Sequence, residues 1–161
     1  MTLFNTLKEN KNIQELIKKT FDADLPIAGD WGYSEKRASI IEALSQNMPL
    51  AQLEHMLTSI RAHLEMNITQ EKEKRYAGIN ANEKARERIH TATATFDKVS
   101  YEITAIKEVL YHAFIKEYKA GYDNETLDLN EHFKRRKEAT LTRKITHYFE
   151  VSNLDIERHE A

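Results

Sequence analysis

One stretch of this sequence has the pattern of a β-strand with one buried face, and it limits the folds open to the chain. From Thr91 to Ala105 the residues are rich in Thr, Val, Tyr and Ile, which favour extended structure. Apolar positions alternate there with polar ones, and a two-residue period predicts a strand. The apolar set is Val99, Tyr101, Ile103 and Ala105, and the polar set is Lys98, Ser100, Glu102 and Thr104.

Three other stretches have the spacing of amphipathic helices. Apolar residues recur every three or four positions over residues 13–21 and over residues 107–119. Asn12 has Glu15 three residues after it, which predicts the start of the first helix. Asp128 and Glu131 repeat that spacing and predict a C-terminal helix that frays beyond Ser152. The apolar stripe of that helix is Phe133, Leu141, Ile145, Tyr148 and Phe149.

Two segments in the middle of the chain fit either a helix or a strand. Residues 34–46 fit a capped helix, and residues 54–68 fit a helix with apolar positions at helical spacing. Residues 60–68, however, also alternate strictly between apolar and polar side chains, as a half-buried strand does. The period alone does not decide between these interpretations.

We therefore predict an α+β fold, with a small, mostly antiparallel sheet and flanking N- and C-terminal helices. An all-α helical bundle is the alternative. The predicted segments are an N-terminal helical segment (1–22), an α+β core (23–122) and a C-terminal helical extension with a polar tail (123–161).

Composition excludes several classes of protein. The chain has 161 residues, with 24 Lys and Arg against 26 Asp and Glu, so it is not a uniformly basic nucleic-acid binder. It has no Cys, which excludes a disulfide scaffold and a cysteine-ligated metal site. Its 4 Gly are too scattered to form a nucleotide-binding loop, and no His spacing is typical of a metal site, so we expect no cofactor and no metal.

No apolar run approaches the ~20 residues that span a bilayer, and the N-terminal residues lack the pattern of a signal peptide. We therefore expect a cytoplasmic protein with no membrane partner.

Three ordered signatures in residues 24–119 carry a resemblance to a known family. They are Gly29-Asp30-Trp31-Gly32-Tyr33 before an apolar segment, then Glu54, Arg61 and Glu65 at fixed spacing, then Phe96-Asp97-Lys98-Val99 with Thr104-Ala105 before a helix. In these features the chain resembles a family of small uncharacterised bacterial proteins. The resemblance implies strands around Ile40 and Ile60 and an α+β fold, and it implies no active site.

A polar sheet face is the first candidate binding site. If residues 60–68 are a strand, alternate side chains point the same way and form a polar row beside the strand at 96–105. Such a face suits an anionic or zwitterionic ligand, although a sheet face that only meets solvent has the same pattern. The candidate ligand-binding residues are Arg61, His63, Glu65, Asn67 and Glu102.

The basic C-terminal segment is the second candidate site. On one continuous helix, His132, Arg136, Arg143 and His147 fall on one side, opposite the apolar stripe. That side suits nucleic acid or another anionic partner, and an ordinary solvated helix has the same pattern. Trp31 and Tyr33, beside glycines, are candidate interface aromatics or core residues.

The function predicted from these features is a non-enzymatic protein–protein interaction module, with a homodimer as one form of it. The alternatives are nucleic-acid or anionic-partner binding by the basic C-terminal helix, and small-ligand binding on the polar sheet face.

Overall fold

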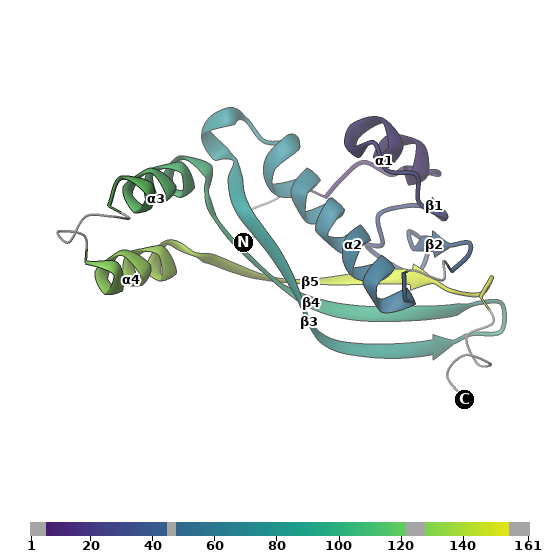
Figure 1. Cartoon of the computed structure of the whole chain (residues 1–161). Helices are drawn as coiled ribbons and strands as arrows, with labels where there is room; N and C mark the ends of the chain where they lie inside the picture. Colours follow the sequence, from purple (N-terminus) through teal and green to yellow (C-terminus); the bar gives the residue numbers. More distant parts are fainter. Residues whose placement is uncertain (1–5, 45–47, 122–127, 155–161) are drawn as a thin grey trace.

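A five-stranded sheet with helices on one side forms the body of the protein (Figure 1). The computed structural model describes residues 6–44, 48–121 and 128–154. The strand order is β1-β2-β5-β4-β3, and within it only β2 and β5 run parallel. The predicted α+β class with a mostly antiparallel sheet is therefore confirmed, and the all-α bundle is excluded.

The N-terminal part builds one edge of the sheet. Helix α1 (Ile13–Phe21) begins as predicted, because the side chain of Asn12 accepts a hydrogen bond from the backbone N–H of Gln14 at 3.2 Å. Strands β1 (Ile27–Gly29) and β2 (Ser39–Ile41) follow and pair with each other. The described part of residues 34–46 is thus a turn and a short strand, and the helical interpretation of that segment is wrong.

Residues 54–68 are helical. Helix α2 (Leu50–His63) continues into η1, one π-helical turn (Leu64–Ile68), and lies across one face of the sheet (Figure 1). Leu53, Leu57 and Leu64 are buried at helical spacing. The helical period of the apolar residues is therefore the one that the structure follows, and the two-residue alternation at 60–68 is not. The strand around Ile60 that the family resemblance implies is therefore not present, whereas the strand around Ile40 is β2.

A long hairpin forms the other side of the sheet. After the short helix η2 (Lys72–Lys74) come β3 (Tyr76–His90) and β4 (Thr95–Lys107), which pair antiparallel with two irregularities of register. The predicted alternation is confirmed in β4, since Val99, Tyr101 and Ile103 are buried and the polar set is only half-buried.

The C-terminal part is a short helix and a central strand instead of one long helix. Helix α3 (Glu108–Gly121) follows β4, and α4 (Leu129–Ala139) begins at the predicted cap, Asp128. Strand β5 (Leu141–Glu150) then inserts between β2 and β4. The predicted helix is wrong beyond Ala139, because the β-favouring residues of 141–150 supply the strand that joins both halves of the sheet.

Helices α3 and α4 lie together and project from one end of the sheet, away from α1, β1 and β2 (Figure 1). We call this pair the arm (residues 108–121 and 129–139). The main apolar core lies between α2 and the sheet, with α1 against β1.

Candidate binding site

The residues predicted to share a polar sheet face do not come together. Arg61 and Glu65 are buried on the side of α2 and η1 that faces the sheet, whereas His63 is exposed. Asn67 donates to the backbone carbonyl of Tyr76 at 2.7 Å, and Glu102 lies on the opposite sheet face. The predicted site is therefore wrong, because it depends on a strand at 60–68.

Arg61 and Glu65 belong instead to a buried ion network. Nε of Arg61 lies 3.3 Å from Oε2 of Glu65, and Nη1 of Arg143 lies 3.1 Å from Oε1. Arg61 also donates to the backbone carbonyl of Thr146 at 2.9 Å. These bonds tie α2 to β5, so both arginines have a structural role and Arg143 is not on a free basic surface.

The two predicted interface aromatics are also used inside the protein. Trp31 is 2% exposed and part of the main core. The hydroxyl of Tyr33 donates to Glu65, and the guanidinium of Arg61 lies 4.0 Å from the centre of the Tyr33 ring. Burial and the charge of Glu65 raise the pKa of Tyr33 to about 12. Neither aromatic is a free anchor for a partner.

His147 is fully buried between the sheet and α2. Its Nε2 lies 2.8 Å from the hydroxyl of Ser39, and its Nδ1 lies 3.0 Å from the hydroxyl of Thr58. Its ring stacks on Phe149 with 4.0 Å between ring centres. Burial, with the nearby Arg61 charge, holds the pKa of His147 well below its usual value. A buried, neutral imidazole cannot meet an anionic partner.

A second buried cluster joins α2 to the hairpin. Glu54 is fully buried, with Oε1 3.1 Å from Nη1 of Arg86, while Nε of Arg88 lies 2.8 Å from Oδ1 of Asp97. Burial, and then the neighbouring Asp97, raise the pKa of Glu54 to about 9, so its carboxyl group holds a proton at neutral pH. Burial acts to raise the pKa of Asp97, but its hydrogen bonds with Arg88 and the charges of Arg88 and Arg86 hold it below its usual value. The two carboxyl groups of this cluster are buried, whereas the side chain of Arg86 is 34% exposed.

Of the predicted basic set, only Arg136 faces an open hollow. Arg143 and His147 are on β5, and His132 is buried in the arm, where Nδ1 lies 3.2 Å from Oε1 of Glu117. The four residues share no surface, because the helix ends at Ala139.

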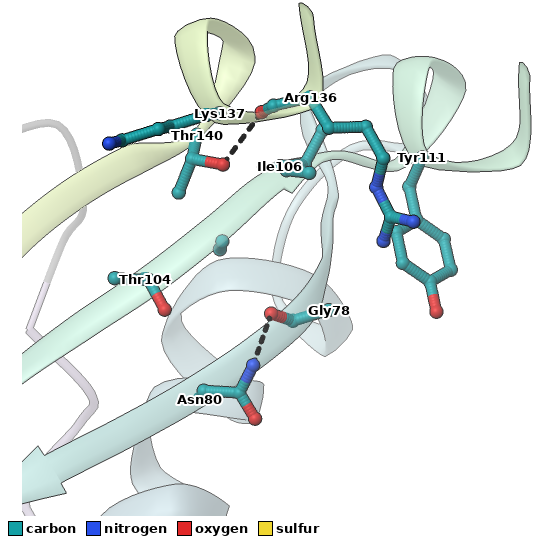
Figure 2. A pocket seen from close by; sticks show the side chains of 9 residues that line it. Gly78, Asn80, Thr104, Ile106, Tyr111, Arg136, Lys137 and Thr140 are labelled. Atoms are coloured by element: carbon teal, nitrogen blue, oxygen red, sulfur yellow. Dashed lines mark hydrogen bonds between the residues drawn. The ribbon is translucent and has the colours of Figure 1, made fainter. Parts of the chain in front are cut away.

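The hollow beside Arg136 lies where the arm meets the sheet and has a volume of about 280 Å³. In Figure 2, Arg136 and Lys137 approach it from α4, and Thr104, Gly78 and Asn80 face them from the strands. We call it the arm-base pocket. Its lining residues are Gly78, Asn80, Thr104, Ala105, Ile106, Tyr111, Arg136, Lys137 and Thr140.

The arm-base pocket is cationic. Two positive side chains line it and no carboxylate does. Glu131 and Glu138 lie on the far side of α4 from Arg136, at about 100° per residue. Among the arginines in the described part of the chain, Arg136 is the one whose guanidinium makes no hydrogen bond or ion pair with another described residue; its backbone carbonyl accepts from the Thr140 hydroxyl at 2.8 Å.

Gly78 gives this pocket its shape. Its φ is +59°, and a Cβ added there would lie 3.1 Å from Cε2 of Tyr111, so the aromatic ring packs directly against the strand.

The outer part of the arm exposes apolar side chains. Phe133 is 48% exposed and Leu129 is 45% exposed, and the two lie on one side of α4. The ring of Tyr118, on α3, lies 6.2 Å from that of Phe133, centre to centre. We call Tyr118, Leu129 and Phe133 the arm patch.

A second hollow, of about 510 Å³, lies further along the sheet face opposite α2. It contains Glu102, one of the predicted ligand residues, between Lys84 and Lys144. Both lysines are exposed, and the three side chains together carry a net charge of +1.

Comparison with known proteins identified no relative of this chain. No family model matches the chain, and no curated protein or solved structure matches it either. The resemblance to a bacterial family and the cytoplasmic location therefore stay predictions.

Two further features of the described residues bear on function. No helix in them is long and apolar enough to cross a membrane. No three His, Asp or Glu side chains gather there in a group that could hold a metal ion.

The sequence does not predict that Lys137, Tyr111 and Thr104 line one pocket. Each was visible as part of a helix or strand pattern, but only the early end of α4 places Arg136 and Lys137 over β4. The signal available was the pair of Thr residues at 140 and 142, where a helix is disfavoured.

Proposed function

We propose that this chain is a non-enzymatic binding module that contacts a protein partner through the arm patch. The observation that carries the proposal is the placement of the exposed apolar side chains. Within the described residues, six large hydrophobic side chains are exposed, and four of these are on α3 and α4. Leu129 at 45% and Phe133 at 48% belong to the arm patch, and Val109 at 67% and Leu110 at 44% lie at the start of α3, at the base of the arm.

The shape of the arm supports this use. The arm is joined to the body only at its base, so its outer end presents two helices side by side to solvent (Figure 1). Exposed apolar patches that include aromatic rings are typical of protein interfaces, because their burial gives most of the binding energy.

Charge favours a partner other than a second copy of this chain. Helix α4 carries Lys134, Arg135, Arg136 and Lys137 against Glu131 and Glu138, so two arms in contact would place like charges together. We therefore infer a partner with apolar side chains surrounded by acidic ones. A homodimer stays the alternative.

The test compares Phe133→Gln with Ile68→Gln, because Ile68 is similarly exposed, at 42%, but lies outside the arm. Each variant is expressed in cells of the source organism, crosslinked chemically and purified. Proteins bound to it in stoichiometric amount are then identified. We expect one partner with the parent protein and with Ile68→Gln, and at least a tenfold loss with Phe133→Gln, the usual scale for an interface aromatic.

Light scattering on the purified protein separates the alternatives. A monomer that captures one partner supports the proposal, and a dimer that Phe133→Gln dissociates supports the homodimer. A monomer that retains no partner, or equal loss with both variants, contradicts both.

A further inference from the structure

We propose that the arm-base pocket is a binding site for a small organic phosphate, with Arg136 as the main contact to the phosphate group. This site is separate from the arm patch and does not depend on the protein partner proposed above. The first observation is that the guanidinium of Arg136 lacks a bonding partner among the described residues. The guanidinium of each other described arginine bonds to a carboxylate or a backbone carbonyl. Arg136 is half-buried beside the pocket, and its guanidinium bonds to no described residue.

A half-buried guanidinium without a partner has lost part of its hydration and has not recovered it inside the protein. A planar guanidinium that presents several N–H donors matches the oxygens of a phosphate or a carboxylate, with two parallel hydrogen bonds. The position therefore favours an anion as the missing partner.

The other polar groups of the pocket are also suited to an anion. Lys137 adds a second positive charge, and the Thr104 hydroxyl and the Asn80 amide lie across the hollow from α4 (Figure 2). One hydrogen of the Asn80 amide is directed to the carbonyl of Gly78 at 3.3 Å, so the second remains as a donor. No carboxylate lines the pocket to repel an anion or to neutralise its cations.

The number of donors favours phosphate over carboxylate. A phosphate monoester has three terminal oxygens and carries close to two negative charges at neutral pH, whereas a carboxylate has two oxygens and one charge. Two cations and two neutral donors around one hollow correspond better to the phosphate.

The remaining walls indicate a ligand with a carbon part. The volume of about 280 Å³ lies near the lower end of the range for small-molecule sites, and is more than one phosphate group fills. Tyr111, Ala105 and Ile106 supply an apolar wall. Two cations are also too few for a nucleic-acid backbone, which proteins bind through many phosphate contacts.

The test is a titration followed by NMR of the backbone amides, with inorganic phosphate, phenyl phosphate and benzoate as probes. We expect saturable shifts at residues 78–80, 104–106 and 136–140, and tighter binding of phenyl phosphate than of either other probe. Arg136→Gln should weaken phenyl phosphate binding about tenfold or more, the scale of one hydrogen-bonded charge, and Lys137→Gln should weaken it less.

Lys134→Gln is the matched control. It removes one positive charge from the same helix, but Lys134 lies on the opposite side of α4 from Arg136 and does not line the pocket. We expect this variant and Phe133→Gln to bind phenyl phosphate within twofold of the parent protein. Phe133→Gln should therefore lose the protein partner and keep phenyl phosphate binding, and Lys134→Gln should also keep it, so one proposal can fail while the other stands.

Three results would overturn the inference. The first is the absence of saturable shifts at millimolar phenyl phosphate. The second is equal weakening by Lys134→Gln and Arg136→Gln, which would show a diffuse effect of charge. The third is binding of benzoate as tight as that of phenyl phosphate, which would remove the assignment to phosphate. An unchanged amide spectrum away from the pocket shows that each variant is folded.

Discussion

At the scale of single residues, buried polar side chains determine how this protein is built. Glu54, Arg61 and Glu65 are buried, although Glu and Arg are usually exposed, and His147 is fully buried as well. Each has a specific partner, as buried polar groups require. Because a hydropathy pattern counts such residues as exposed, the sequence predicts surface roles for Arg61, Glu65 and His147 that the structure does not give them.

Gly32 shows how closely this interior is packed. Its φ is +86°, and a Cβ added there would lie 2.0 Å from Cδ2 of His147. We predict that Gly32→Ala lowers the free energy of unfolding by about 2–4 kcal/mol, from backbone strain and overlap with the ring. Chemical denaturation measures this change.

A double-variant comparison separates those two causes. In a His147→Ala background the ring is absent, so Gly32→Ala should cost only about 1 kcal/mol, the part that comes from backbone strain. An equal cost in both backgrounds would show that the contact with His147 is not responsible.

At the scale of elements, two strands differ in how far their sequences predict them. Strand β4 is predicted correctly, because its buried face alternates with a polar face. Strand β3 has no such signal, since it is an edge strand whose charged residues from Glu83 to Arg88 are mostly exposed, and its pairing with β4 determines its structure. A hydropathy pattern within one segment cannot predict a strand that forms because of its pairing with a neighbouring strand.

Strand β5 explains the error at the C-terminal end. Leu141, Ile145 and Phe149 are four residues apart, which fits one face of a helix as well as one face of a strand. Two of the inward positions between them are Arg143 and His147, whose polarity hides the two-residue period. The arm-base pocket could not be predicted for the same reason, since it exists only where α4 gives way to β5.

The contact between α2 and the hairpin gives a pH-dependent prediction. The pKa of Glu54 is about 9 in the folded protein, against an ordinary value of 4.5. Its protonated form is therefore favoured by folding, and this contribution is complete below about pH 4.5 and is lost as the pH rises towards about 9. Glu54→Gln keeps the shape without the titration, so we predict that it raises the free energy of unfolding at pH 8 by about 1–3 kcal/mol.

The measurement is the free energy of unfolding of both proteins at pH 5 and at pH 8. The gain from Glu54→Gln should be larger at pH 8 than at pH 5. A gain that is equal at the two pH values, or a loss at pH 8, would mean that Glu54 is ionised in the folded protein. Glu83→Gln, on the exposed side of Arg86, is the control for a general effect of removing one carboxylate.

At the scale of the whole molecule, the interior and the arm have different roles. Helix α2 covers one sheet face with apolar contacts and two clusters of polar side chains, and the opposite face has the hollow beside Glu102. The arm has an apolar patch at its outer end and a cationic pocket at its base. Both binding sites proposed for this chain are therefore on the arm or at its base.

Site-specific photocrosslinking in living cells tests the central claim most directly. A photoreactive amino acid replaces Phe133 on the arm patch or, in a second protein, Ile68 near the end of η1. If the arm is the partner-binding surface, irradiation should give one discrete crosslinked species from position 133 and none above background from position 68. Equal crosslinking at both positions, or a discrete species from position 68 alone, would contradict it.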